Sequence, residues 1–157
     1  MAKILVIDDE QSILELLTLR LTESGNEVVT ANDGLSGPMV AAREKPDLII
    51  LDYNMPAANG AKVHERLRGN DFTAATPIIF LTATPIGEII VMVKDDDRTR
   101  FLQKPVDFRL LFKTMNDFLP GSAPPSAPPA QPAEAPPPKR YNPVAGTGAA
   151  GDVLDLD

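Results

Sequence analysis

The chain contains no cysteine and no tryptophan, and only 5% of its 157 residues are aromatic. Without cysteine it can hold no disulfide framework, no catalytic thiol and no cysteine-based zinc site. Hydrophobic residues nevertheless make up 43% of the chain, which is enough to build a core. The length and composition therefore favour one ordinary domain rather than two.

Positive charge is also scarce. The formal net charge is −7, which disfavours nucleic acid as a partner because phosphate contacts need clustered Lys and Arg. The first ten residues, MAKILVIDDE, carry one lysine and a short apolar run that ends in acidic residues. This pattern is unlike a signal peptide or a membrane span, so we expect a cytoplasmic protein with no membrane partner.

Proline is unevenly distributed along the chain. Ten of the 16 prolines lie from Pro120 onward, in a stretch rich in Pro and Ala that has no apolar periodicity. We therefore predict a folded domain over residues 1–119 and an extended, disordered tail over 120–157. The last residues, GDVLDLD, alternate apolar and acidic side chains. They are either a frayed terminus or a short motif that docks on a partner.

The folded part alternates apolar runs with amphipathic segments. Apolar runs predict strands over residues 3–7, 26–31, 47–51, 77–82 and 100–103. Helical spacing of apolar residues predicts helices over 11–25, 36–45, 61–69, 86–96 and 107–119. Strands that alternate with helices in this way predict an α/β fold with a parallel sheet covered on both faces.

Polar residues end or follow four of these five predicted strands. They are Asp8, Asp9 and Glu10, then Asp52, Thr82 and Lys104. Ligands of open parallel sheets bind outside the carboxyl ends of the strands, so we expect these side chains to meet there. Crowded carboxylates need a cation, and oxygen ligands without His or Cys favour Mg²⁺. With a lysine and a hydroxyl beside them, the set predicts phosphoryl transfer onto a carboxylate.

Each of these residues has an ordinary alternative. A single Asp after a strand is more often a helix cap or a turn residue, and an acidic pair is usually a solvated loop. A threonine in a strand and a lysine before proline are equally unremarkable. Only their joint placement at one edge of the sheet favours the chemical interpretation.

The chain resembles the receiver domains of two-component response regulators. The resemblance covers about residues 1–119 and rests on DD at 8–9, LDYNMPAANG at 51–60, LTA at 81–83 and FLQKP at 101–105. The intervals between the key residues also fit: 44 positions from Asp8 to Asp52, 30 to Thr82 and 22 to Lys104. It implies a flavodoxin-like doubly wound sheet with strand order 2-1-3-4-5.

The resemblance implies a role for each residue. Asp52 would accept a phosphoryl group from a sensor histidine kinase or a phosphotransfer protein, with catalytic help from Thr82 and Lys104. Asp9, Asp52 and the backbone carbonyl of Asn54 would bind Mg²⁺ directly, and Asp8 would bind it through water. The backbone of Asn54 and Ala83 would bind the phosphate.

The resemblance also implies a switch and an output. Thr82 would turn toward the phosphoryl group, Phe101 would change from exposed to buried, and the bond between Lys104 and Pro105 would be cis. A downstream protein would bind the face formed by residues 86–119, with help from the tail. No DNA-binding output domain is expected after residue 119, and the chain is expected to be a phosphoacceptor rather than an enzyme.

Other interpretations remain open at this point. The chain could be an adaptor whose receiver surface binds constitutively, or a fragment of a longer regulator. A phosphatase with an aspartyl nucleophile would generally place a second acid at position 54, where this chain has Asn. The single histidine, His64, is interpreted as a surface residue of the third helix.

Overall fold

The computed structural model describes residues 2–56, 58–94 and 96–119. These residues form a single parallel sheet of five strands in the order β2-β1-β3-β4-β5. The strands are β1 (Lys3–Ile7), β2 (Glu27–Ala31), β3 (Leu48–Asp52), β4 (Ile78–Thr82) and β5 (Thr99–Gln103). The predicted fold class and strand order are confirmed. The predicted tail lies outside the described residues.

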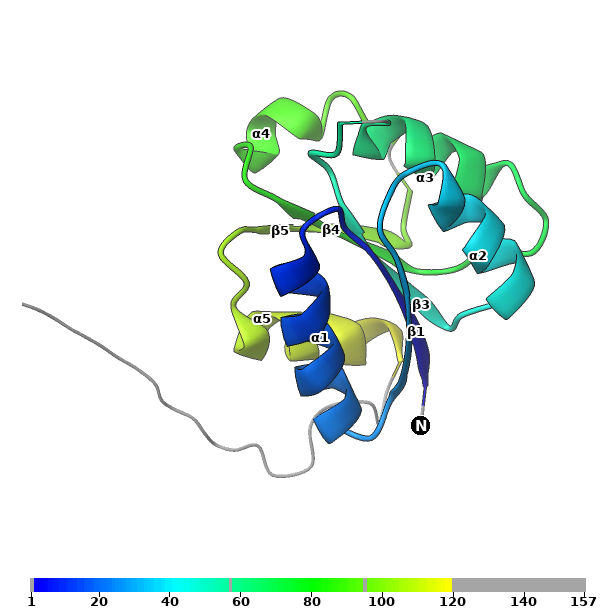
Figure 1. Ribbon diagram of the computed structural model, residues 1–157. Coiled ribbons are helices and arrows are strands. Elements are labelled where there is room, and N and C mark those ends of the chain that lie inside the picture. The colour runs from blue at the N-terminus through cyan, green and yellow to red at the C-terminus, as the bar shows by residue number, and fades with distance from the viewer. Residues whose placement is uncertain (1, 57, 95, 120–157) are drawn as a thin grey trace, which may run out of the picture. The chain divides into compact units, whose positions relative to one another are not determined.

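Five helices connect and follow the strands. They are α1 (Gln11–Glu23), α2 (Ser36–Glu44), α3 (Gly60–Arg68), α4 (Ile86–Ile89) and α5 (Phe108–Phe118). Helices α1 and α5 cover one face of the sheet, while α2 and α3 cover the other (Figure 1). None of the helices in the described part of the chain is long and apolar enough to cross a membrane.

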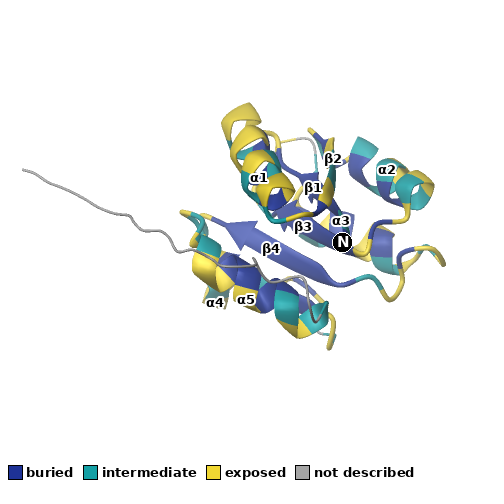
Figure 2. Ribbon diagram, turned by 90° about the horizontal axis from the view of Figure 1, so that it is seen from below, coloured by how far each residue is buried: buried dark blue, intermediate teal, exposed yellow. Residues whose placement is uncertain are grey.

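The core lies on both faces of the central strands. Every residue of β3 and β4 is buried, whereas the edge strand β2 is mostly exposed or half-buried (Figure 2). One apolar cluster packs under α1 and α5 and the other packs under α2 and α3. Burial on both faces explains why the central strands have uninterrupted apolar sequences.

Helix α5 agrees with the helix predicted over residues 107–119, whereas helix α4 is shorter than predicted. Helix α5 begins after Asp107, whose side chain accepts a hydrogen bond from the Leu110 backbone N–H at 3.2 Å. The helix predicted over residues 86–96 is wrong in length, because regular helix ends at Ile89. Gly87 and the β-branched run that starts at Ile89 are poor helix formers, which accounts for the early end.

Candidate functional site

The carboxyl edge of the sheet brings the predicted site residues together. Parallel register aligns the ends of β1, β3, β4 and β5. The side chains at or just after those ends are Asp8, Asp52, Thr82 and Lys104. Asp8, Asp52 and Thr82 are buried, which is unusual for polar groups and calls for partners among them.

Asp52 is one of the two buried acids of this edge, with Asp8. It is 2% exposed, and its Oδ1 accepts a hydrogen bond from the Asn54 backbone N–H at 3.1 Å. Burial, and then the negative charge of Asp8, raise its pKa from 3.8 to about 7, although Asn54 and Lys104 act in the opposite direction. Its environment in the metal-free protein therefore favours the carboxylic acid form of Asp52 more than water does.

Lys104 joins the acids of the edge. Its Nζ lies 3.4 Å from Asp52 Oδ1, 3.3 Å from Asp8 Oδ2 and 3.2 Å from Glu10 Oε1. Burial alone would lower the pKa of Lys104, but the charges of Asp52 and Asp8 outweigh it and raise that pKa. The peptide bond between Lys104 and Pro105 is cis, as the resemblance implied.

Three carboxylates could hold a metal ion here. Oxygen atoms of Asp8, Asp9 and Asp52 all lie within 4.8 Å of one another, and Asp9 is exposed while the other two are buried. A hard cation that keeps several waters needs such an arrangement, with acids on one side and solvent on the other. The donor set therefore fits Mg²⁺ and contains no nitrogen or sulfur ligand that would favour a softer metal.

A hydrogen-bonded group links the loops that follow β3 and β4. The Asn54 side chain accepts from the Ala83 N–H and from Thr82 Oγ1, both at 3.3 Å, and donates to Thr84 Oγ1 at 2.9 Å. Thr82 Oγ1 also accepts from the Thr84 N–H at 2.9 Å. The hydroxyl and the Ala83 amide are thus already paired within the protein, so each would have to exchange a partner to bind a phosphate.

Phe101 lies apart from the acidic edge. It is half-buried on β5, and its ring stacks on Phe80 of β4 with centroids 5.2 Å apart and planes 5° apart. The structure therefore places the predicted switch residue in the layer beneath α3, next to the core and not next to Asp52.

The interpretation of His64 as a surface residue is wrong. Its side chain is only 2% exposed and faces Asp96 and Thr99. The buried residues of α3 are Gly60, Val63, His64 and Leu67. This spacing of three, four and seven residues is the signature of a buried helix face, and it could have identified the histidine from the sequence.

Glu10 also belongs to the site, although the sequence analysis did not assign it a role. It contacts Lys104 across 94 positions of the chain, and its own N–H donates to Asp8 Oδ1 at 2.9 Å.

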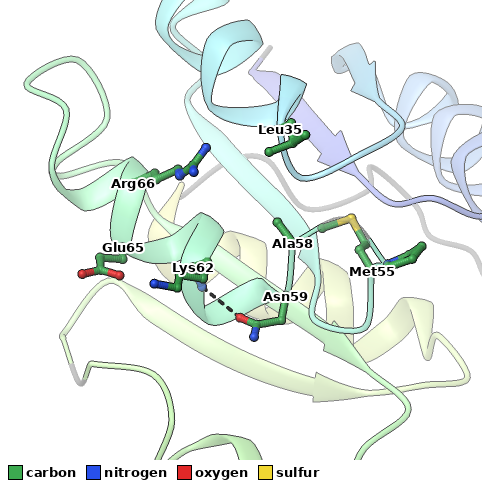
Figure 3. Close-up of a pocket in the computed structure, with 8 residues that line it drawn as sticks. Leu35, Met55, Ala58, Asn59, Lys62, Glu65 and Arg66 are labelled. Carbon is green, nitrogen blue, oxygen red and sulfur yellow. Dashed lines mark hydrogen bonds between the residues drawn. The ribbon is translucent and has the colours of Figure 1, made fainter.

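A groove of about 540 Å³ lies between Leu35 at the start of α2, the loop around Met55 and helix α3 (Figure 3). That groove is not lined by Lys104 or by the acids of the sheet edge, which are Asp8, Asp9, Glu10 and Asp52.

Comparison with known proteins agrees with this geometry. Residues 4–116 match the family model described as the response regulator receiver domain. The chain is 36% identical over 121 residues to Protein PilH of Pseudomonas aeruginosa, which covers 77% of this chain and 100% of PilH. It is 38% identical over 109 residues to the DNA-binding dual master transcriptional regulator RpaA of Synechocystis sp., which covers 68% of this chain and 44% of RpaA.

Solved structures give the same result. The chemotaxis response regulator CheY4 of Vibrio cholerae superposes with a TM-score of 0.69 and 34% sequence identity, covering 75% of this chain and 98% of that protein. The chain thus spans all of PilH and nearly all of the CheY4 chain but less than half the length of RpaA.

Proposed function

The chain belongs to the family of response regulator receiver domains, and we propose that Asp52 is its phosphoacceptor in a two-component phosphorelay. Receiver domains are phosphoacceptor signalling domains that bind Mg²⁺ at an acidic pocket. The observation that carries the proposal is the position of Asp52, which lies buried between Asp8 and Lys104 at the carboxyl edge of the sheet.

The proposed reaction is a transfer of one phosphoryl group. An oxygen of Asp52 forms a bond to phosphorus while the N–P bond of a phosphohistidine on the donor breaks. The electron pair of that bond returns to the imidazole nitrogen, which then takes up a proton. Asp52 must be ionised to attack, and Lys104 helps to keep it so because the ammonium lowers the pKa of that carboxyl.

The other residues of the edge would bind Mg²⁺ and the phosphoryl group. Asp9 and Asp52, with the Asn54 backbone carbonyl, would bind Mg²⁺ directly, and Asp8 would bind it through water. When bound, the ion would neutralise the phosphoryl oxygens. The Lys104 ammonium, already within 3.4 Å of Asp52, is close enough to pair with the new phosphoryl group. The backbone amides of Asn54 and Ala83 would complete the phosphate site.

We propose that Thr82 and Phe101 respond to the phosphoryl group on Asp52 and change the surface formed by α4, β5 and α5. Thr82 would exchange its bonds to Asn54 and Thr84 for one to the phosphoryl group, and Phe101 would become fully buried. The segment after α4 supports a role in partner contact, because Ile90, Val91 and Met92 are 50%, 79% and 63% exposed.

The donor would be a sensor histidine kinase or a phosphotransfer protein, and the chain would act in the cytoplasm. Output would be contact between α4, β5 and α5 and a downstream protein. The tail over residues 120–157 would act as a tether that raises the local concentration of that partner.

The proposal is tested by incubating the full chain with a small acyl phosphate and recording its intact mass. With Mg²⁺ we expect a gain of one phosphoryl group, and with a chelator we expect almost none. No gain with Mg²⁺ would remove the phosphoacceptor assignment, and an equal gain with the chelator would remove the role of the metal.

A further inference from the structure

The single histidine of the chain is buried in a polar cluster that the proposed phosphorylation does not use. His64 Nε2 lies 3.1 Å from Asp96 Oδ2 and 3.0 Å from Thr99 Oγ1. Asp96 precedes β5, so this contact ties helix α3 to the segment between α4 and β5. Because a carboxylate can only accept, the neutral imidazole carries its hydrogen on Nε2.

Arg68 fixes Asp96 in this position. Its Nε donates to Asp96 Oδ2 at 3.1 Å and its Nη2 donates to Oδ1 at 3.3 Å, which is a two-point clamp. Asp96 also accepts from Thr99 Oγ1 and from the Arg98 N–H. Burial alone would raise the pKa of Asp96, but these bonds lower it to about 2, so Asp96 remains an anion at any ordinary pH.

Two ring contacts connect His64 to the proposed switch residue. The His64 ring lies 5.7 Å from the Phe80 ring, and Phe80 stacks on Phe101 at 5.2 Å. His64 and Phe101 therefore both pack against the Phe80 ring. A movement of His64 changes the space available to Phe80, and through it the packing of Phe101.

If His64 is protonated, the new hydrogen on Nδ1 has no hydrogen-bond acceptor among the described residues. Nδ1 makes no hydrogen bond to any residue in the described part of the chain. Burial, and then the charge of Arg68, lower the pKa of His64, while Asp96 acts in the opposite direction. His64 also lines a groove of about 620 Å³ between α3 and the segment after α4, and three exposed charged residues of the described chain line the same groove: Lys62, Glu65 and Lys94.

We propose that His64 is a positioning residue for Phe101, and that protonation of its imidazole, which adds a buried Nδ1 hydrogen without an acceptor among the described residues, shifts the ring against Phe80 and changes the packing of Phe101. The imidazolium then moves toward the groove, where water can accept its Nδ1 hydrogen. A lower pH thus changes the packing of Phe101 through His64, independently of the titration of Asp52. The inference rests on the proposed function, because Phe101 matters only if its position controls partner binding.

The test follows two NMR signals of the full chain between pH 5 and pH 8. One is the imidazole Cε1 hydrogen, which needs no assignment because the chain has one histidine. The other is the ring of Phe101. Both are recorded in an Asp52→Asn background with a chelator, so that titration of the Asp52 carboxyl does not contribute.

We expect both signals to change together, with one midpoint below 6.5. In His64→Gln, which keeps an amide N–H near the position of Nε2, the change at Phe101 should be lost. In Asp96→Asn, both midpoints should move together to lower pH, because the anion that favours the imidazolium is gone. A merely structural histidine would not make Phe101 follow its titration.

Two results would overturn the inference. One is a Phe101 signal that stays constant while His64 titrates. The other is a Phe101 signal that changes equally in His64→Gln. Phosphorylation is measured separately by the mass of His64→Gln made with Asp52 intact, which should gain one phosphoryl group like the parent. The NMR test needs no phosphorylation, so the failure of one proposal can be distinguished from the failure of the other.

Discussion

The Nζ atom of Lys104 lies 3.4 Å from Asp52 Oδ1 and 3.3 Å from Asp8 Oδ2. One ammonium group thus joins the carboxylate that follows β1 to the one that ends β3. Two acids and one lysine leave a net negative charge, which a divalent cation can neutralise. The balance among these three residues controls how easily Asp52 ionises, and it leads to the first two predictions.

The stability of the metal-free protein should depend on the protonation of Asp52. Its pKa is raised from 3.8 to about 7 on folding, so the folded state binds the proton more tightly than the unfolded state. The resulting stabilisation is fully present below pH 3.8 and is lost as the pH rises through about 7.

Urea unfolding in a chelator measures this dependence. The free energy of unfolding of the parent, relative to that of Asp52→Asn, should decrease across this pH range, and Mg²⁺ should restore it most at the upper end. Parallel curves for parent and variant would show that Asp52 does not titrate in this way.

Lys104→Met should destabilise the protein, because it leaves Asp8 and Asp52 buried without their shared cation. At pH 8 we expect a loss of about 1–3 kcal/mol in the free energy of unfolding, since the lysine is partly open to solvent. The pKa of Asp52 should rise further, which carbon NMR of its carboxyl can follow. Lys113→Met, on the exposed surface of α5, is the matched control and should change stability by less than about 0.5 kcal/mol. Equal losses in the two variants would contradict the role of Lys104.

Gly60→Ala should destabilise the protein through the packing of α3. A Cβ at Gly60 would lie 2.7 Å from the Phe80 ring and 2.8 Å from the Tyr53 Cα, so the helix must shift, at a cost of about 1–3 kcal/mol. Gly87→Ala in α4 meets nothing within 4 Å and should be neutral or stabilise by up to about 1 kcal/mol. Chemical unfolding compares the two, and equal effects would show that the contact with Phe80 is not tight.

Arg68→Met should cost more than the same change at Arg66. Arg68 donates to Asp96 and to the backbone oxygens of Thr73, Thr76 and Arg98, so its removal takes a charged donor from four acceptors and breaks the two-point clamp on Asp96. We expect a loss of about 2–4 kcal/mol in the free energy of unfolding.

Arg66 is the matched control for this change. It is exposed and has no ion pair within the described residues, so the same substitution there should have little effect. A small loss at both positions would show that water replaces the bonds made by Arg68.

The sheet could be predicted because both faces of a parallel sheet are buried. The runs that became β3 and β4 are short, rich in β-branched residues and apolar up to their last residue, which favours a strand buried on both faces over a helix. The polar residues at the strand ends were predictable for the same reason, because parallel strands place their carboxyl ends at one edge. The motifs around Asp52 and Lys104 also made it possible to predict the protein family from the sequence.

Two features were predicted wrongly from the sequence. Helix α4 ends early because Gly87 and Ile90 do not favour continuation, although Ile89 and Val93 keep helical spacing and are both buried. His64 was judged by its residue type, whereas its spacing from Val63 and Leu67 placed it on the buried face. Its partner Asp96 lies 32 positions away, so only the folded chain could reveal the pair.

The measurement that tests the central claim most directly is the intact mass of three proteins after incubation with an acyl phosphate and Mg²⁺. They are the parent, Asp52→Asn and Asp71→Asn, in which Asp71 is an exposed carboxylate in the loop after α3. We expect the parent and Asp71→Asn to gain one phosphoryl group each, and Asp52→Asn to gain none. A gain in Asp52→Asn equal to that of the parent, or no gain in the parent, would contradict the assignment of Asp52 as the phosphoacceptor.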